Sequence, residues 1–469
     1  MLSLLCLGQL MVVVDVSIVN VALPAIRSDL GFSQVGLQWV VNSYALTYSG
    51  FLLLGGRAAD LFGRRRVFVA GLALFVLASL AGAVAQDPTT LVIARSAQGL
   101  GGAILSPATL TLVTTTFTGP ARPKAMAAWS AVAGGGAAVG SVLGGVLTQL
   151  VDWRWILWVN IPIGLLTIVG AYTLLHESRA DAAKSRLDVF GSLLVTAGLM
   201  AMVYGTVQSP TKGWGSVETL APLIGGAALL VWFVVHEARV AAEPLMPLGF
   251  FKVRPVTVAN LTMLWLGCAV IAHFFFLSLY MQNVLKYGAL DAGLAFLPGS
   301  AAMTIGAYSG PALMKRVDPR LLIAGGPVLV VAGLLWLSFI PADGTYLTNL
   351  FVPMLLVTFG TGVAMMPISF SAMTGIAPQE AGLASGVINT TRQVGGAIGL
   401  AVLATVAASQ TAGTGTAGLV EGYQAAFLTG AVFAVLAVLT ALFMPKAQAP
   451  SAPPVAEPAK SADAGTATA

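Results

Sequence analysis

The sequence predicts an all-α integral membrane protein, a helical bundle of two six-helix halves with two extra helices between them. Three observations support this fold: an apolar composition, long apolar runs, and a pattern that recurs in the two halves. Of the 469 residues, 57% are hydrophobic and only 9% are charged, and the mean hydropathy is +0.89. Water-soluble domains of this length are far less apolar. We therefore expect the chain to lie in a lipid bilayer.

The apolar runs have the length of membrane-spanning helices. A helix needs about 20 mostly apolar residues to cross the ~30 Å hydrocarbon layer. The runs lack the alternation of apolar and polar residues that marks transmembrane β-strands. About fourteen of them occur, beginning near Leu2, Leu37, Val67, Thr90, Ala125, Trp155, Asp188, Thr219, Pro255, Asp291, Leu321, Leu347, Leu383 and Gly422.

The basic residues predict the orientation of the chain. Cytoplasmic loops carry the excess of Lys and Arg near helix ends. With a cytoplasmic N-terminus, 17 of the 23 Lys and Arg residues fall in cytoplasmic loops, four fall in external loops, and Arg95 and Arg392 lie inside the membrane. Both termini of this multi-pass protein of the cell membrane are therefore expected to be cytoplasmic. The net charge of +5 follows from this topology and needs no nucleic-acid partner.

Two pairs of segments indicate an internal repeat. GGRAADLFGRRRVFVAGL at 55–72 resembles SGPALMKRVDPRLLIAGG at 309–326, and GLGGA at 99–103 recurs as GTGVA at 360–364 at nearly the same offset. Two matches in the same order predict two related halves. Secondary transporters have this architecture, and their halves rock around a central site.

The repeat also sets the expected domain boundaries. Residues 1–175 form the N-terminal half and 255–444 the C-terminal half. Residues 176–254 hold two inserted helices and their cytoplasmic linkers. The tail at 445–469 is rich in Ala, Pro and Ser and is expected to be a disordered cytoplasmic segment.

Several functional classes find no support in the residues. The first apolar run lacks a basic leader and a cleavage site, so it is interpreted as a retained helix. Cys6 and Cys268 both lie in apolar runs, so neither a disulfide nor a metal site is expected. No nucleophile with its base, metal-ligand spacing or nucleotide-binding loop is recognisable. The chain is therefore predicted to be neither an enzyme nor the carrier of a cofactor.

One carboxylate lies deep in an apolar run. Asp15 is near the middle of VVVDVSIVNVALP, where an ionised Asp costs about 2.5 to 3.5 kcal/mol on insertion scales. Arg95 in the fourth run lies at a similar depth, since the first and fourth helices run in opposite directions. The pair is interpreted as a proton-coupling site that faces a cavity, and a structural ion pair is the alternative.

A central cavity is expected to be lined by polar and soft side chains from both halves. Arg392 has either a structural or a cavity role, and His273 is either a packing residue or a relay or substrate contact. Met365 and Met366 are adaptable contacts. The predicted polar residues of the cavity are Asn20, Asn42, Tyr44, Gln98, His273, Tyr280, Gln282, Asn389, Arg392 and Gln393.

A glycine stripe predicts close helix packing. The segment AGGGAAVGSVLGG at 133–145 places Gly136, Gly140 and Gly144 on one helix face, and Gly145 follows them. Small residues at this spacing let two helices approach closely.

The loop GRAADLFGRRR predicts a conformational gate. An acid at the end of one helix and arginines at the start of the next can form ion pairs that break when the halves move. Membrane topology alone is the other explanation for the arginines. The predicted gate residues are Gly56, Asp60, Gly63, Arg64, Arg65 and Arg66.

Taken together, these motifs resemble those of the major facilitator superfamily, specifically its fourteen-helix drug:proton antiporters. The loop at 56–66 is similar to the signature G-x-L-A-D-x-x-G-R-[RK]-[RK], with Ala58 in place of Leu. The segment at 91–103 is similar to the fourth-helix motif, and 14–24 to the first-helix motif. The fifth-helix motif G-x-x-x-G-P-x-x-G-G is matched at 136–145, except that Ser141 replaces the proline.

The resemblance implies a function in multidrug or antibiotic efflux. Asp15 would be the protonatable acid, Arg95 its partner and the arginine loop the cytoplasmic gate. The expected partners are protons, the lipid bilayer and an amphipathic small molecule, and the chain is expected to act as a monomer. Because only one intramembrane carboxylate is present, neutral or monocationic substrates are expected. A proton symporter for uptake of a small organic solute is the alternative, since it would use the same scaffold.

Overall fold

The computed structural model describes residues 1–33, 35–175, 177, 187–241, 244–246, 248–314, 316–376, 381–411 and 415–445. Apart from Pro445, the tail predicted to be disordered lies outside these residues. The long helices are α1 (Leu2–Leu30), α2 (Trp39–Phe62), α3 (Arg64–Ala83), α4 (Pro88–Thr116), α5 (Ala121–Leu150), α7 (Asn160–Leu174), α8 (Val189–Lys212), α9 (Val217–Arg239), α10 (Arg254–Asn283), α12 (Leu297–Leu313), α13 (Pro319–Leu337), α14 (Val352–Ser371), α15 (Ala381–Gln410) and α16 (Thr416–Leu442).

Short segments extend three of these helices. The four residues of α6 (Trp155–Trp158) precede α7, α11 (Ala289–Ala295) precedes α12, and a π-helical turn, η3 (Tyr346–Phe351), leads into α14. In the described part of the chain the helices thus form about fourteen rods, one for each predicted run. The prediction of an all-α, fourteen-helix membrane fold is confirmed.

Eleven of the described helical segments are long and apolar enough by composition to cross a membrane. The helices α2 and α4 are absent from this set, and α5 is represented only by the shorter apolar stretch Ala138–Leu150. The helices α2 and α4 hold charged and polar residues, such as Arg57 and Arg95, and they pack against each other. Their composition therefore fits helices that bury polar groups against neighbouring helices.

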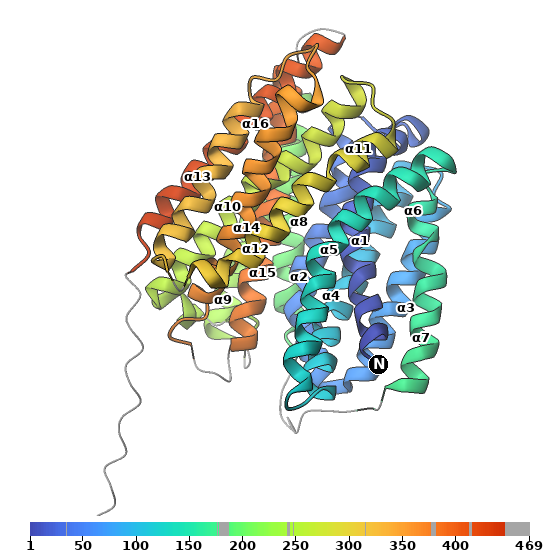
Figure 1. Cartoon of the computed structure of the whole chain (residues 1–469), viewed down its shortest axis with the longest axis vertical. Helices are drawn as coiled ribbons and strands as arrows, with labels where there is room; N and C mark the ends of the chain where they lie inside the picture. Colours follow the sequence, from blue (N-terminus) through green and yellow to red (C-terminus); the bar gives the residue numbers. More distant parts are fainter. Residues whose placement is uncertain are drawn as a thin grey trace, which may run out of the picture.

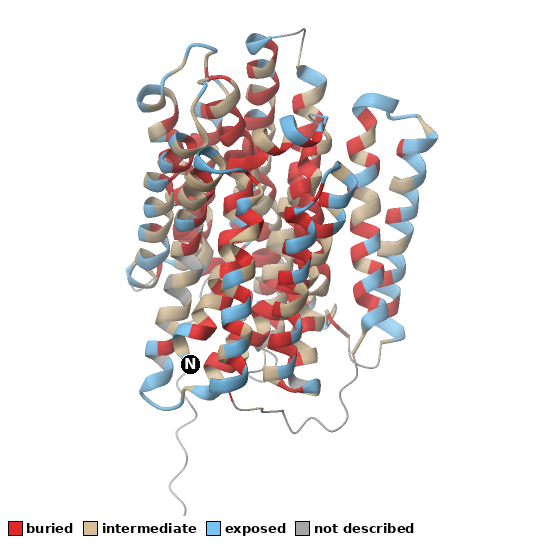
Figure 2. Cartoon of the chain, turned by 90° about the vertical axis from the view of Figure 1, so that its right-hand side faces the viewer, coloured by how far each residue is buried: buried red, intermediate tan, exposed pale blue. Residues whose placement is uncertain are grey.

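The helices form two lobes (Figure 1). The first lobe comprises α1–α7 and the second α10–α16, and α8 packs against α9 and also contacts α2 and α15. Buried residues fill the interior, and exposed ones cover the outer faces of the helices (Figure 2). We call the end of the bundle that carries Met1 and Arg64–Arg66 the arginine end, and the end that carries Leu30, Leu150 and Asn283 the distal end.

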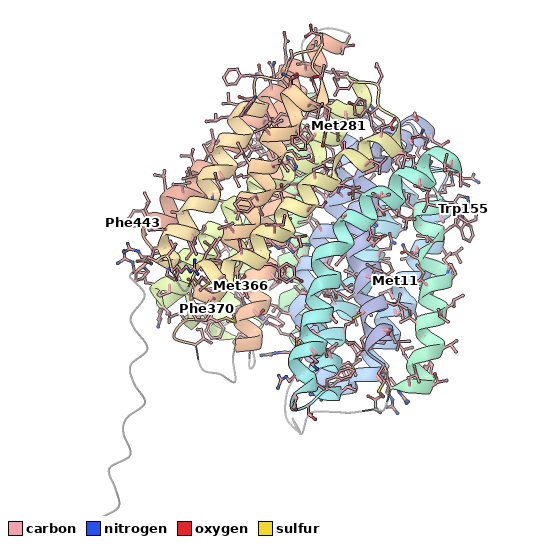
Figure 3. The ribbon with its side chains drawn as sticks, viewed as in Figure 1. Met11, Trp155, Met281, Met366, Phe370 and Phe443 are labelled. Atoms are coloured by element: carbon pink, nitrogen blue, oxygen red, sulfur yellow. The ribbon has the colours of Figure 1, made fainter. Side chains whose placement is uncertain are left out.

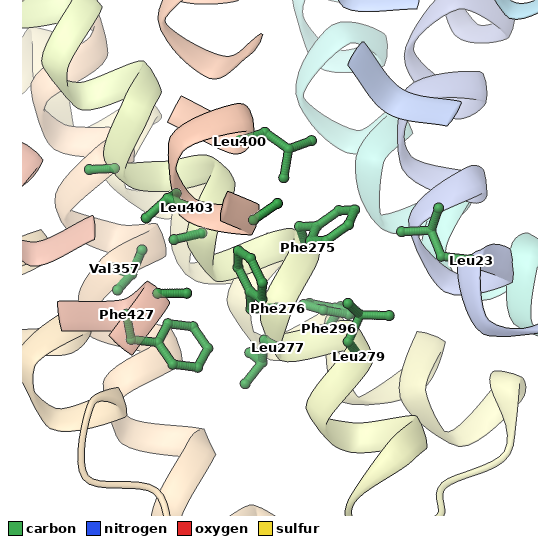
Figure 4. Packing of buried hydrophobic residues seen from close by; sticks show 14 of the residues in the cluster. Leu23, Phe275, Phe276, Leu277, Leu279, Phe296, Val357, Leu400, Leu403 and Phe427 are labelled. Carbon is green, nitrogen blue, oxygen red and sulfur yellow. The ribbon is translucent and has the colours of Figure 1, made fainter. Parts of the chain in front are cut away.

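The two lobes share a hydrophobic core toward the distal end. Leu23 of α1 belongs to the same buried cluster as Phe275 and Phe296 of the second lobe (Figure 4). Toward the arginine end the first lobe has a separate core, which includes Leu5 and Phe68. The cores of the lobes are therefore joined at one end and separate at the other.

Most hydrogen bonds between the lobes have the same distribution, although the Thr390 hydroxyl of α15 also donates to the Ser49 carbonyl oxygen of α2, at 3.5 Å, away from the distal end. The Ser278 hydroxyl donates to the Asn20 carbonyl oxygen at 2.8 Å, and the Gln282 amide donates to the Val21 carbonyl oxygen at 2.9 Å. Near the end of α5, the Gln149 side chain accepts from the backbone N–H of Leu290 at 2.8 Å. The bonds of Ser278, Gln282 and Gln149 hold the lobes together at the distal end.

Close glycine contacts recur in the two lobes. A Cβ added to Gly101 of α4 would lie 3.0 Å from the Gly71 carbonyl oxygen of α3. In the second lobe, a Cβ added to Gly360 of α14 would lie 2.5 Å from the Gly326 carbonyl oxygen of α13. The repeat pairs Gly71 with Gly325 and Gly101 with Gly362, so the two contacts are alike in kind but lie at different positions of the repeat.

Candidate functional site

Asp15 and Arg95 form a fully enclosed ion pair. The Arg95 Nη1 atom lies 2.5 Å from Asp15 Oδ2, and the side chains are 2% and 0% exposed. Arg95 Nε also donates to the Val40 carbonyl oxygen at 3.1 Å. The pairing predicted from helix depth is thus present in the structure. Its role in proton coupling stays a prediction.

Amide side chains surround the ion pair. Gln98 Nε2 donates to Asp15 Oδ1 at 3.2 Å, and its Oε1 accepts from Arg95 at 2.9 Å. Gln98 also donates to Ser79 at 2.7 Å, and Asn160 donates to Asp15 Oδ1 at 3.3 Å. Helices α1, α3, α4 and α7 therefore meet at one carboxylate. Sequence reasoning missed Ser79 and Asn160, although both are polar residues inside apolar runs.

Tyr44 separates the ion pair from the cavity. The Arg95 guanidinium carbon lies 4.5 Å from the centre of the Tyr44 ring, and this ring stacks on Tyr48 with centres 5.9 Å apart. Both tyrosines line the cavity, whereas Asp15 and Arg95 do not. The prediction that Asp15 faces the cavity is therefore wrong for this conformation, because the carboxylate turns toward α4 and α7.

A cavity of about 440 Å³ lies between the lobes. On α1 its wall runs from Gln9 to Val21, or about 18 Å along the helix at 1.5 Å per residue. On α10 it runs from Met263 to Phe274. Cavities of a few hundred Å³ with mostly apolar walls suit drug-sized ligands.

Half of the predicted polar residues line this cavity, and half lie elsewhere among the described residues. Those on the wall are Asn20, Tyr44, Asn389, Arg392 and Gln393. Those placed elsewhere are Asn42, Gln98, His273, Tyr280 and Gln282. Met365 also lines the cavity, but Met366 is 49% exposed and lies on the second lobe toward the arginine end (Figure 3).

The five residues placed elsewhere have other partners or surroundings. Asn42 donates to Gln38 at 3.3 Å, and the Tyr280 hydroxyl donates to the Pro341 carbonyl oxygen at 2.5 Å. Gln98 belongs to the Asp15 network and Gln282 to the contact between the lobes. His273 is fully buried, and neither ring nitrogen has a hydrogen-bond partner among the described residues. These corrections share one cause: the identity of a polar residue in a helix does not set the direction it faces.

Other polar wall residues were not predicted. Gln9, Ser17, Tyr48, Ser106 and Trp129 all line the cavity. On α1 a usable signal was present, since Gln9, Ser17 and Asn20 recur at spacings that bring residues to one helical face.

The arginine loop has an acidic partner that sequence reasoning missed. The Glu177 carboxylate accepts from the backbone N–H groups of Arg65 and Arg66, both at 3.2 Å, and thus caps α3. Gly63 before this helix has a φ of 102°, and a Cβ there would lie 2.6 Å from Glu177 Oε1. Glycine is therefore required here. Arg64 directly follows the turn, Gly56 lies inside α2 near Pro107, and the side chain of Asp60 lies outside the described part.

The glycine stripe of α5 packs on α1. Added Cβ atoms would lie 2.9 Å from Val13 at Gly136, 2.8 Å from the Val14 carbonyl oxygen at Gly140, and 2.7 Å from the Ile18 carbonyl oxygen at Gly144. Gly145 faces the other lobe, where a Cβ would lie 2.6 Å from the Ala289 carbonyl oxygen. Ser141 stands at the position of the motif proline, within α5, which is one helix from Ala121 to Leu150.

Comparison with known proteins yields a family and several relatives. A family model described as "Major Facilitator Superfamily" matches residues 5–400. The chain is 44% identical to the cephamycin export protein CmcT of Amycolatopsis lactamdurans, with 97% of this chain and 93% of that protein covered. It is 42% identical to the puromycin resistance protein pur8 of Streptomyces alboniger, with 93% and 88% covered.

Solved structures share the fold at low sequence identity. A mutant of the nucleoside transporter NupG gives a TM-score of 0.67 at 12% identity, with 94% of this chain and 99% of that chain covered. The inward-open xylose transporter XylE from E. coli gives 0.63 at 12% identity, with 96% and 97% covered. With its two lobes, its central cavity and a family match over most of its length, the chain belongs to the major facilitator superfamily.

Proposed function

We propose that the protein exports amphipathic drugs or antibiotics across the cell membrane in exchange for protons. The observation that carries the proposal is a buried ion pair of Asp15 and Arg95 that contacts Tyr44, a residue on the wall of a drug-sized cavity. Relatives named for antibiotic export or resistance, which match over most of the chain, support an export role.

The proposed mechanism uses the ion pair as a charge switch. Ionised Asp15 attracts the Arg95 guanidinium, whereas a protonated Asp15 is neutral and holds it weakly. Arg95 is also bonded to Val40 and stacked on Tyr44, both of α2. Proton uptake would therefore loosen α1 from α2 and α4, and the lobes would reorient around the cavity.

The proposed orientation places the arginine end in the cytoplasm, together with both termini. In that orientation the described conformation is closed toward the outside, because three of the four hydrogen bonds between the lobes in the described part of the chain lie at the distal end. The arginine loop would then act as the cytoplasmic gate, with Glu177 as an added member. Both lobes of one chain line the cavity, and the proposed working unit is a monomer.

Transport by the purified protein in liposomes tests the proposal. An imposed pH gradient is expected to drive an amphipathic dye out of the compartment that corresponds to the cytoplasm. Asp15→Asn is expected to abolish the response to the gradient while leaving exchange down a dye gradient. Asp15→Glu, which keeps a titratable group, serves as the matched variant and should retain part of the response.

Two results would contradict the proposal. Gradient-driven export of undiminished rate by Asp15→Asn would remove Asp15 from proton coupling. Accumulation of the dye in the same direction as the protons would establish symport instead of antiport.

A further inference from the structure

The wall of the cavity is positively charged. Of the described residues that line it, Arg392 alone is charged, and Asp, Glu, Lys and His are absent from them. A guanidinium stays protonated in proteins, so its charge persists at every physiological pH. A ligand in the cavity therefore meets one fixed cation and a largely apolar surface.

Arg392 has no carboxylate partner among the described residues. Its Nη2 atom donates to the Asn389 side-chain oxygen at 3.0 Å. Arg95, the other arginine inside the membrane, is neutralised by Asp15. A buried cation that lacks a counter-ion is costly and marks a functional site in a membrane protein.

Asp15 is not available as the counter-ion. Its side chain is 0% exposed, and its two oxygens are already occupied by Arg95, Gln98 and Asn160. A cationic substrate would therefore face Arg392 without a balancing carboxylate on the described wall. The expectation of monocationic substrates depended on an Asp15 that faces the cavity, and the structure does not favour it.

Most of the remaining wall is apolar. Side chains such as those of Ile271, Phe274 and Met303 form much of the surface. Tyr44 and Trp129 also line the cavity, but Tyr44 Oη and Trp129 Nε1 are themselves buried. The cavity thus combines one guanidinium with a largely apolar body.

We propose that the preferred substrates are amphipathic carboxylates whose carboxylate pairs with Arg392. The planar guanidinium offers two parallel N–H donors to a carboxylate, an arrangement that is stronger than neutral hydrogen bonds. The apolar part of the substrate packs against α10 and α12. The inference deepens the proposed export function and rests on it only for the direction of transport.

Equilibrium binding tests the inference separately from transport. The full chain is placed in nanodiscs of phosphatidylcholine, and the dissociation constants of phenyloctanoate, its methyl ester and phenyloctylamine are measured by calorimetry. The three probes share one apolar body and differ in head-group charge. The wild type is expected to bind the carboxylate about tenfold more tightly than the ester, and the amine most weakly.

Two substitutions remove the free guanidinium charge in different ways. Arg392→Gln deletes it, and Asn389→Asp places a carboxylate of the same shape where Arg392 already donates at 3.0 Å. Both are expected to lower the carboxylate-to-ester affinity ratio about tenfold. If Arg392→Gln fails to fold, Asn389→Asp still tests the inference, because it keeps Arg392 and adds an ion pair. Arg254→Gln, which alters an exposed arginine at the start of α10, is the control and should keep the wild-type ratio.

The outcomes separate the inference from the proposed function. The inference is overturned if the wild type binds the carboxylate and the ester equally well. It is also overturned if the carboxylate-to-ester affinity ratio is the same in both variants as in the wild type. Either result would leave the proposed function standing if the ester is exported under a proton gradient. The measurement is repeated in nanodiscs that contain anionic phosphatidylglycerol. If the affinity ratio exceeds one in phosphatidylcholine but not in phosphatidylglycerol, lipid head groups compete for Arg392, and the carboxylate assignment holds for the lipid-free site. If phenyloctanoate shows no preference in phosphatidylcholine but phosphatidylglycerol binds through Arg392, the site belongs to lipid and the inference fails.

Discussion

Asp15 is tolerated in the membrane because every nearby polar contact favours its charge. Arg95, Gln98 and Asn160 all reach its carboxylate oxygens. Removal of one member of such a buried ion pair typically costs about 3 to 5 kcal/mol, because the remaining charge is left without compensation. Protonation of the carboxylate would weaken its bonds to Arg95, Gln98 and Asn160, as the proposed mechanism requires.

Tyr44 is expected to position Arg95 through its ring and not through its hydroxyl. Tyr44→Phe keeps the ring 4.5 Å from the guanidinium carbon and should retain proton-driven export within about twofold. Tyr44→Leu removes a cation–π contact of roughly 0.5 to 2 kcal/mol and should lower the export rate severalfold. The two rates are compared in liposomes at one pH gradient. Equal rates in the two variants would rule out the positioning role.

At the scale of the element, contact with a neighbouring backbone decides which glycines are required for helix packing. Glycine is frequent throughout the chain, with 53 residues. Gly140 is closed in by the Val14 backbone, whereas a Cβ at Gly135, on the same helix, would meet nothing within 4 Å. Sequence spacing identified the stripe, and the structure distinguishes its members from neighbouring glycines.

Gly140→Ala is expected to destabilise the α1–α5 contact. Its Cβ would lie 2.8 Å from the Val14 carbonyl oxygen and 3.2 Å from the Val14 Cα, and backbone cannot rearrange as a side chain can. Overpacking of this kind costs about 1 to 3 kcal/mol. Thermal unfolding in detergent should show a lower midpoint for Gly140→Ala than for Gly135→Ala. A midpoint for Gly140→Ala equal to the wild type would show that the helices separate freely.

Asp188 caps α8 and ties it to α9. Its Oδ1 atom accepts from the Gly191 N–H at 2.8 Å and lies 2.9 Å from His236 Nε2. Partial burial opposes ionisation, but the hydrogen bonds from Gly191 and His236 outweigh it, and the pKa of Asp188 is below its ordinary value. A lowered pKa means that the ionised group stabilises the fold above its unfolded pKa of about 3.9.

The contribution of Asp188 is therefore expected to be lost in acid. Asp188→Ala should lower stability by about 1 kcal/mol at neutral pH. The difference from the wild type should shrink as the pH falls through the lowered pKa, below about 3.9. Unfolding midpoints measured across this range check the sign. Asp188→Asn, which can still cap a helix but does not titrate, should show a smaller loss at neutral pH.

At the scale of the whole molecule, the lobes meet through a few hydrogen bonds and a shared apolar core at the distal end. Such an interface has two stable arrangements when each end can close in turn. Gln282 contributes to closure through its bond to the Val21 carbonyl oxygen of α1. Its loss should therefore favour opening at the distal end.

Gln282→Leu is expected to shift the conformational population about fivefold toward the distal-open state, since a hydrogen bond contributes about 1 kcal/mol. Spin labels at Ser28 and Asp343, in a background without Cys6 and Cys268, report the distance between the lobes. Gln208→Leu is the control, because Gln208 donates only to Tyr204 among the described residues. An unchanged distance distribution in Gln282→Leu would show that the apolar core alone maintains closure.

The order of residues along the chain was enough to predict the helices of the membrane fold and the pairing of Asp15 with Arg95. These features depend on local hydropathy and on depth in the membrane, which can be counted from the sequence. The rotation of each helix could not be predicted, because helices that are apolar on most faces give no preference for one direction. Gln98 and His273 therefore face away from the cavity, although their residue types suit it.

Contacts between distant segments were decided by tertiary packing. Glu177 caps α3 from a point more than a hundred residues away, and nothing near Arg65 in the sequence indicates this partner. The charge of the cavity likewise depends on which side chains pair elsewhere: Arg95 has Asp15, and Arg392 has none on the described wall. Hydropathy is a property of single segments, whereas compensation of a buried charge is a property of the assembled bundle.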